Sequence, residues 1–103
     1  MLSREDFYNV IKITTLTSVD LVLECNNKIL CGLRNNNPAK GFWFVPGSRT
    51  YKNELLRDAI NRVGLTELGI DLSQKEFHSL GAYDHIYPNN FIDSEFETHY
   101  VAN

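Results

Sequence analysis

Apolar residues recur every three or four positions in two segments of the chain, which is the spacing of an amphipathic helix. In the first segment Ser3 and Asp6 resemble a capping box, so we predict a short helix over residues 3–12. The apolar face of the second helix is made by Leu55, Leu56, Ala59, Ile60 and Val63. Gly69 is expected to end this helix, because glycine readily adopts the conformation of a helix C-cap.

Apolar and β-branched residues run together in the segments between and after these helices, as they do in strands. The predicted strands cover residues 18–25, 28–34, 42–45, 75–87 and 96–102. The first two are expected to pair as a hairpin around Asn26 and Asn27, and the third is expected to stop at Pro46. Strands mixed with one principal helix predict a layered α/β fold, arranged as a single domain over residues 1–103.

Composition narrows the class of protein. The chain has 103 residues, of which 43% are hydrophobic, so it suits one small globular domain. Its net charge of −3 gives no general attraction to nucleic acid or anionic membrane, and we expect neither as a partner. No window approaches the roughly 20 apolar residues of a membrane span, so a cytoplasmic protein is expected. Cys25 and Cys31 are predicted to be reduced, buried thiols.

Charged residues of the second helix carry the first chemical indication. Glu54, Asp58 and Arg62 share one edge of that helix, which on its own predicts an ordinary surface ion pair. Glu67 projects instead onto the apolar face, where a carboxylate needs a metal ion or a buried arginine. If the helix frays at Gly64, Glu67 becomes an exposed residue of the last turn, and both readings stay open at this point.

The same segment keeps the register of a known motif, the Nudix box, written G-x5-E-x7-R-E-U-x-E-E-x-G-U with U an aliphatic residue. Glu54, Arg62, Glu67 and Gly69 occupy box positions, whereas Ser48, Val63 and Thr66 replace the first glycine and two glutamates that usually bind metal. One branch of the superfamily lacks the same two glutamates, and the chain resembles that branch, the GDP-mannose mannosyl hydrolases. The resemblance is carried by "LTSVDL", "LCGLRNNNPAKGFWFVPGSR", "NRVGLTELG", "YDHIYPNNF" and "FETHYV".

This resemblance implies a fold, a reaction and a cofactor. The fold would be a Nudix-like alpha/beta/alpha sandwich with a mixed sheet, shortened by the C-terminal strand and helix of the family. The reaction would be Mg²⁺-dependent hydrolysis of GDP-mannose to GDP and mannose, with water attacking the anomeric carbon. Glu67 and the backbone carbonyl of Gly47 match the family's magnesium ligands, an oxygen-only set that suits this ion.

The resemblance also implies roles for individual side chains. Arg34 and Arg49 match arginines directed at the substrate, Tyr100 matches the leaving-group tyrosine and Asp20 matches a sugar-side carboxylate. These four are the candidate catalytic residues, and together with Arg62 they are the candidate substrate-binding residues. From the residues alone, Asp20, Arg34 and Tyr100 are also compatible with ordinary strand or strand-end positions.

Three functions remain open, because the chain ends at Asn103, before the family's metal-ligating glutamine and the histidine thought to act as its base. The chain could be a hydrolase that uses His85 or His99 instead, an inactive GDP-sugar-binding remnant, or a Nudix enzyme that cuts a diphosphate at phosphorus. A shortened sheet would leave an unpaired edge, so a homodimer is expected. A role in surface polysaccharide synthesis is implied by the family alone. The aromatic residues 42–44 are expected to pack in the core and at the rim, and the alternative is that one of them stacks on the guanine of the ligand.

Overall fold

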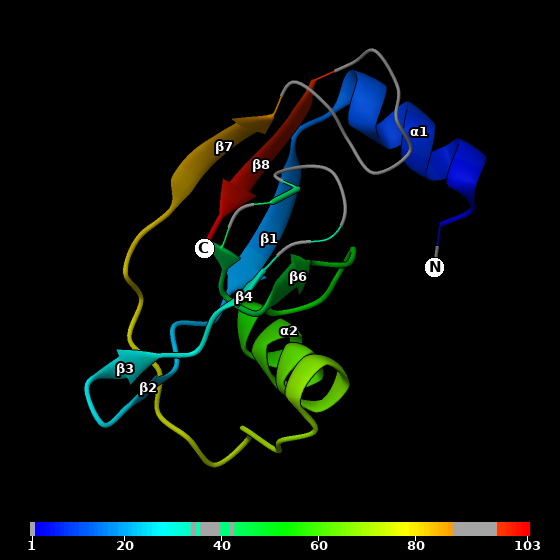
Figure 1. Cartoon of the computed structure of the whole chain (residues 1–103). Coiled ribbons are helices and arrows are strands. Elements are labelled where there is room, and N and C mark those ends of the chain that lie inside the picture. Colours follow the sequence, from blue (N-terminus) through cyan, green and yellow to red (C-terminus); the bar gives the residue numbers. More distant parts are fainter. Residues whose placement is uncertain (1, 34, 36–39, 42, 88–96) are drawn as a thin grey trace.

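The computed structural model describes all residues except 1, 34, 36–39, 42 and 88–96 (Figure 1). Its elements are α1 (Arg4–Ile13), β1 (Leu16–Asp20), β2 (Glu24–Cys25), β3 (Lys28–Ile29), β4 (Gly32–Leu33), β5 (Trp43–Phe44), β6 (Gly47–Arg49), α2 (Leu56–Val63), η1 (Gly64–Leu68), β7 (Tyr83–Tyr87) and β8 (Thr98–Ala102). In the described part of the chain, no helix combines the length and the apolar composition needed to cross a membrane.

Four strands form the main sheet in the order β6-β1-β8-β7. β1 runs antiparallel to β6 and parallel to β8, and β8 runs antiparallel to β7, so the sheet is mixed. β2 pairs with β3 and β4 pairs with β5 in two separate short hairpins. The predicted fold class, α/β with a mixed sheet, is confirmed. β6 and β7 are the edge strands, and pairing of a second copy at either of them stays a prediction.

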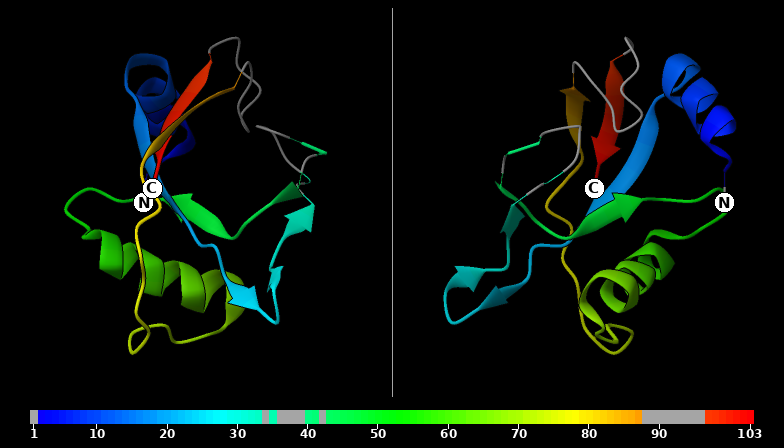
Figure 2. Two further views of the ribbon diagram at one scale, coloured as in Figure 1. Left: turned by 90° about the vertical axis from the view of Figure 1, so that its left-hand side faces the viewer. Right: turned by 45° about the vertical axis from the view of Figure 1, so that its right-hand side comes forward.

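Two buried clusters attach the helices to the sheet. The first consists of Phe7, Ile11 and Leu16, and the second of Val19, Leu21, Ala59, Val63 and Leu72. Leu16 and Val19 lie an odd number of positions apart on β1, so their side chains point to opposite faces. α1 therefore covers one face of the sheet and α2 the other. Figures 1 and 2 show α1 beside the start of β1 and α2 beneath β6.

Several predicted local features are present. Ser3 begins α1, and its Oγ accepts a hydrogen bond from the Asp6 N–H at 3.1 Å. Asn26 and Asn27 have φ values of 52° and 63°, which fits the tight turn predicted between β2 and β3. Gly69, with φ 66°, caps η1, the π-helical turn that continues from α2, so the helical segment stops where it was predicted to stop.

The predicted strands are too long. The segment predicted as one strand over 18–25 is divided into β1 and β2, and the segment 28–34 is divided into β3 and β4. In the segment 75–87 only Tyr83–Tyr87 is a strand. A run of apolar residues shows which residues favour extended structure, but it does not show where a partner strand ends.

The expectation that the third strand stops at Pro46 is confirmed, because β5 ends at Phe44 and a new strand, β6, begins at Gly47 in the main sheet. The Pro46 carbonyl still accepts a hydrogen bond from the Leu21 N–H at 2.7 Å, next to the pairing of Asp20 with Gly47. Proline has no N–H to donate, but its carbonyl can accept a hydrogen bond beside an edge strand.

The prediction that Cys25 and Cys31 are buried was also wrong, because both thiols are free and exposed. Cys25 belongs to the β2–β3 hairpin, and Cys31 lies in the short segment between β3 and β4. This hairpin projects from the main sheet (Figure 1), and neither buried cluster includes a cysteine.

Candidate functional site

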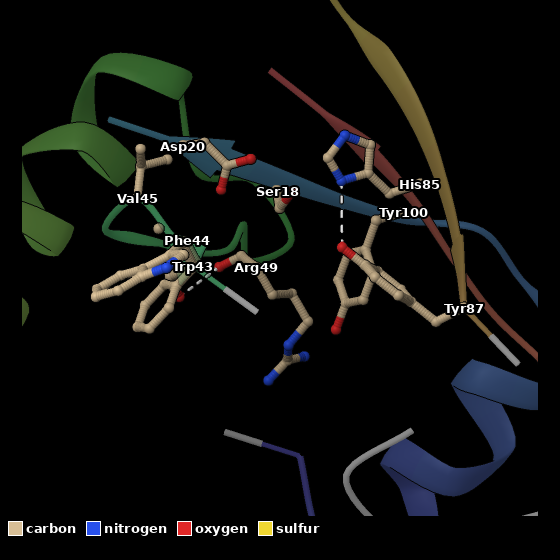
Figure 3. Close-up of a pocket in the computed structure, with 11 residues that line it drawn as sticks. Ser18, Asp20, Trp43, Phe44, Val45, Arg49, His85, Tyr87 and Tyr100 are labelled. Atoms are coloured by element: carbon tan, nitrogen blue, oxygen red, sulfur yellow. Dashed lines mark hydrogen bonds between the residues drawn. The ribbon is translucent and has the colours of Figure 1, made fainter. Parts of the chain in front are cut away.

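A cavity of 490 Å³ opens on the sheet face that α1 partly covers (Figure 3). Its volume lies within the range of about 300–1,000 Å³ that is usual for small-molecule sites. It is lined by Ser18, Asp20, Trp43, Phe44, Val45, Gly47, Ser48, Arg49, His85, Tyr87 and Tyr100. Four predicted site residues, Asp20, Gly47, Arg49 and Tyr100, thus lie around one cavity although they come from three separate strands, β1, β6 and β8.

Strand register explains why these residues meet. Asp20 of β1 pairs with Gly47 of β6, and His85 of β7 pairs with Tyr100 of β8. Paired residues in a sheet place their side chains on the same face. The mixed sheet therefore brings side chains of four strands to one surface.

Asp20 and Gly47 form a pair without mutual backbone hydrogen bonds. The Asp20 N–H donates to the other side, to the Asn103 carbonyl at 2.8 Å, while the next residue, Leu21, donates to Pro46. A Cβ atom on Gly47 would lie 2.3 Å from Asp20 Oδ1, so the close approach requires glycine. In this register the Gly47 carbonyl points away from β1.

Asp20 is exposed and lines the cavity, but the surrounding protein atoms partly desolvate its carboxyl group. This burial raises the pKa of Asp20 above its ordinary value of 3.8, and the charge of His85 acts in the opposite direction. Protonated Asp20 is thus easier to form here than in water. A carboxyl of this kind serves either to accept a proton or to bind a sugar hydroxyl.

Arg49 carries the positive charge of the cavity. Its guanidinium carbon lies 4.6 Å from the centre of the Phe7 ring and 5.4 Å from that of Tyr51. Within the described residues, no carboxylate forms an ion pair with Arg49. The aromatic faces hold the guanidinium while its hydrogen-bond donors stay available, which suits an anionic ligand such as phosphate.

His85 is the histidine that the structure places in the cavity, facing Tyr100 across the β7–β8 pair. Its Nδ1 lies 3.2 Å from the Tyr87 hydroxyl. His99 lies on the opposite face of β8, with Nε2 2.9 Å from Asp84 Oδ1. Both histidines lie on strands and form a hydrogen bond, but of the two only His85 lines this cavity.

Arg62 does not line the cavity, but it bonds to two residues of β6 that do. Its Nε donates to Glu54 Oε2 at 2.8 Å, Nη2 donates to the Arg49 carbonyl at 2.8 Å, and Nη1 donates to Ser48 Oγ at 3.2 Å. The Arg62 side chain is only 22% exposed. Each guanidinium nitrogen therefore bonds to protein, and the geometry gives Arg62 a positioning role for β6. A direct substrate contact by Arg62 stays a prediction, since it does not line the cavity.

The projection of Glu67 onto the buried face was wrong. α2 ends at Val63, and residues Gly64–Leu68 form a turn of π-helix in which Glu67 is exposed. The wider turn alters the angle between successive residues, so a count at 100° per residue fails beyond Val63. Leu55 and Leu56, predicted on the same apolar face, are 55% and 49% exposed.

Glu67 and the Gly47 carbonyl are the predicted magnesium ligands, and their chemistry fits the ion. Both supply oxygen, and among the described residues no hydrogen bond or ion pair occupies the Glu67 carboxylate. The orientation of the Gly47 carbonyl away from β1 leaves it out of that pairing. Within the described residues, no group of three or more acidic, histidine or cysteine side chains could hold a metal.

Trp43 and Phe44 line the cavity, whereas the sequence analysis placed the aromatic run in the core and at the rim. Trp43 is 74% exposed and Phe44 40%. Successive strand residues face opposite sides, so the two rings cannot both pack against the same surface. Arg34 and Phe42 lie outside the described residues.

Comparisons with known proteins agree with this architecture. No family model matches the chain. The chain is 42% identical over 87 residues to the low-salt glycan biosynthesis protein Agl8 of Haloferax volcanii, which covers 84% of the chain and 54% of that protein. A solved structure, a MutT/nudix family protein from Enterococcus faecalis, is similar over 98% of the chain and 42% of its own length, with a TM-score of 0.64 and 24% identity.

The structural likeness shows the fold, not the activity. The chain spans about half the length of the curated relative that it matches and less than half of the structural neighbour. The described residues therefore form a mixed α/β structure that is similar in fold to a MutT/nudix family protein.

Proposed function

We propose that the cavity binds a nucleoside diphosphate sugar, with GDP-mannose as the substrate, and that it takes part in Mg²⁺-dependent hydrolysis of this compound to GDP and mannose. The proposal rests on one observation: Asp20, Gly47, Arg49 and Tyr100, which the family resemblance singles out, lie around the same cavity. The name of the Haloferax volcanii relative supports it, because glycan biosynthesis consumes activated sugars.

Binding of the diphosphate would depend on Arg49. Its donors are not taken by a described carboxylate, and a guanidinium fork suits two phosphate oxygens. Tyr100 lines the same cavity and would donate its hydroxyl hydrogen to the departing diphosphate, whose negative charge grows as the glycosidic bond breaks. Arg62 would keep Arg49 in place through the bond to its backbone carbonyl.

The sugar would lie toward Asp20 and His85. In the proposed reaction a water oxygen forms a bond to the anomeric carbon while the bond from that carbon to the diphosphate oxygen breaks. The proton of the water has to be accepted, and His85 is better placed than His99 because it lines the cavity. Asp20 would hold a sugar hydroxyl and stabilise positive charge that develops on the ring.

Mg²⁺, when held by Glu67 and the Gly47 carbonyl, would supply positive charge next to the diphosphate. Position 47 matters twice in this arrangement. The absence of a side chain allows the Asp20 carboxylate to approach, and the register of the pair directs the backbone carbonyl away from β1.

Phosphorus NMR of the purified chain with GDP-mannose and Mg²⁺ tests the proposal. We expect the signals of GDP to appear, with mannose as the second product. Asp20→Asn and Arg49→Gln should abolish this conversion, whereas Arg57→Gln, a change of an exposed arginine on α2, should not.

The products separate the alternative functions. GMP and mannose 1-phosphate would mean that the chain cuts at phosphorus, as a Nudix pyrophosphohydrolase does, and would refute attack at carbon. An unchanged substrate that still binds would indicate a GDP-sugar-binding protein and would refute hydrolysis by this chain.

A further inference from the structure

We propose that Trp43 is a platform on which the nucleobase of the ligand stacks, and that it contributes affinity without choosing between purines. This inference rests on the proposed function, because it takes the ligand of the cavity to be a nucleoside diphosphate or its sugar ester. It assigns to Trp43 the stacking that the sequence left open for one of the aromatic residues 42–44.

The exposure of Trp43 is the first observation. Tryptophan is among the most buried residues on average, yet the Trp43 side chain is 74% exposed while it lines a cavity. Large exposed aromatic surface beside polar groups is typical of a binding site.

The β4–β5 hairpin explains why the indole faces outward. Phe44 pairs with Gly32, and a Cβ atom on Gly32 would lie 3.1 Å from Cε1 of the Phe44 ring. The Phe44 ring therefore lies directly on the glycine backbone. Trp43, one residue earlier, pairs with Leu33, which is itself 52% exposed. Packing on Gly32 thus positions the Phe44 ring, whereas the Trp43 indole stays exposed to solvent.

The position of Trp43 in the cavity gives the ligand a direction. Figure 3 shows Trp43 and Phe44 at one end, His85 and Tyr87 at the other, and the Arg49 side chain reaching between them. A diphosphate at Arg49 would thus have an aromatic surface on one side and hydrogen-bonding side chains on the other. A nucleoside is the part of the ligand that matches the aromatic end, and a sugar is the part that matches the polar end.

Stacking has a recognisable consequence for specificity. Every base has a π-face, so an indole platform binds different bases with similar strength. Trp43 carries a single hydrogen-bond donor at Nε1 and no acceptor, and stacking leaves the Watson–Crick edge of the base unread. Removal of the platform should weaken binding of guanine and adenine nucleotides by the same factor.

Trp43 is the only tryptophan of the chain, so its fluorescence reports on this residue directly. We expect GDP and ADP to quench the emission and inorganic pyrophosphate to leave it unchanged, because pyrophosphate has the same charged groups but no base. Calorimetry then compares the three ligands with Trp43→Leu and Trp43→Phe. Trp43→Leu should raise the dissociation constants of GDP and ADP about tenfold and leave that of pyrophosphate unaltered. Trp43→Phe, which keeps a ring, should retain most of the affinity.

Leu80→Ala is the matched control, since Leu80 is 66% exposed and does not line the cavity. It should bind all three ligands as the unchanged chain does. If GDP binds but neither quenches Trp43 nor loses affinity in Trp43→Leu, the stacking role is wrong while the proposed function stands. If Trp43→Leu weakens pyrophosphate equally, the residue shapes the cavity and is not a platform. If none of the three ligands binds the unchanged chain, the proposed function and this inference fail together.

Discussion

Arg62 and Glu54 form a two-point contact, in which Nε lies 2.8 Å from Oε2 and Nη2 lies 3.0 Å from Oε1. The same guanidinium donates to the carbonyl of Arg49, so the pair connects the last turn of α2, and the segment that precedes this helix, to the last residue of β6. Glu54 and Arg62 thus form a structural connection in this chain.

Glu54→Gln should therefore destabilise the fold. The variant keeps one acceptor but loses the charge, and hydrogen bonds to charged groups contribute about 1.5–3 kcal/mol. Because the pair retains some contact with water, with side chains 22% and 14% exposed, we expect a loss of about 1 kcal/mol in the free energy of unfolding. Urea denaturation measures it, with Asp58→Asn on the same helix as the control. An equal loss in Asp58→Asn would refute a specific role for the pair.

Low pH should weaken the contact between Glu54 and Arg62. Hydrogen bonding from Arg62, with smaller help from the Tyr51 N–H and the Arg62 charge, holds the pKa of Glu54 below its ordinary value of 4.5. A lowered folded-state pKa contributes stability that is present above pH 4.5 and is lost as the pH falls through the folded-state value. Urea midpoints from pH 6 down to about pH 3 should fall more steeply for the unchanged chain than for Glu54→Gln. Parallel curves would contradict the prediction.

Asp20 should have the opposite effect on stability. Burial raises its pKa above 3.8, so the folded state holds a proton that the unfolded state has already released in the window above that value. Stability from Asp20 is then present at low pH and is lost as the pH rises through the raised pKa. Asp20→Asn, which cannot ionise, should be more stable than the unchanged chain at pH 7 and nearly equal at pH 3. It should also fail to hydrolyse GDP-mannose. A variant that is less stable at pH 7 would show that the carboxylate is a structural group.

Gly47 should tolerate no side chain. In Gly47→Ala the new Cβ would lie 2.3 Å from Asp20 Oδ1 and 2.6 Å from the Val19 carbonyl oxygen. Overpacking of this kind costs about 1–3 kcal/mol, measured as a shift of the urea midpoint. The double variant Asp20→Ala/Gly47→Ala removes the first clash and keeps the second, so it should be less destabilised than the sum of the single changes. Strict additivity would mean that the two residues do not meet as described.

The sequence predicted the fold class, the Ser3 cap, the Asn26–Asn27 turn and the stop at Gly69, because each depends on local chemistry. The family resemblance also indicated Asp20, Gly47, Arg49 and Tyr100 as site residues. The sheet brings these four residues together around one cavity. Such proximity depends on which strands become neighbours, and no local pattern contains that information.

The predictions that were wrong have the same cause, because they depended on information that no local pattern contains. Glu67 was predicted to lie on the buried face, but a π-turn follows Val63. The spacing of apolar residues does not indicate such a change in helix type. Cys25 and Cys31 were predicted to be buried but are exposed, because burial depends on whether a hairpin packs against the sheet. The exposure of Trp43 follows from the packing of its neighbour on Gly32, a contact between residues twelve positions apart.

The magnesium assignment has a test that does not require turnover. Glu67 is exposed and has no described bonding partner, so Glu67→Gln should change stability without metal by no more than about 0.5 kcal/mol. An ion that binds only the folded state raises the melting temperature, and we expect millimolar Mg²⁺ with GDP to stabilise the unchanged chain but not this variant. Glu76→Gln, a change of another exposed carboxylate, is the control and should respond to Mg²⁺ normally. Equal stabilisation of both variants by Mg²⁺ would remove Glu67 from the site and would leave the diphosphate to Arg49 and Tyr100.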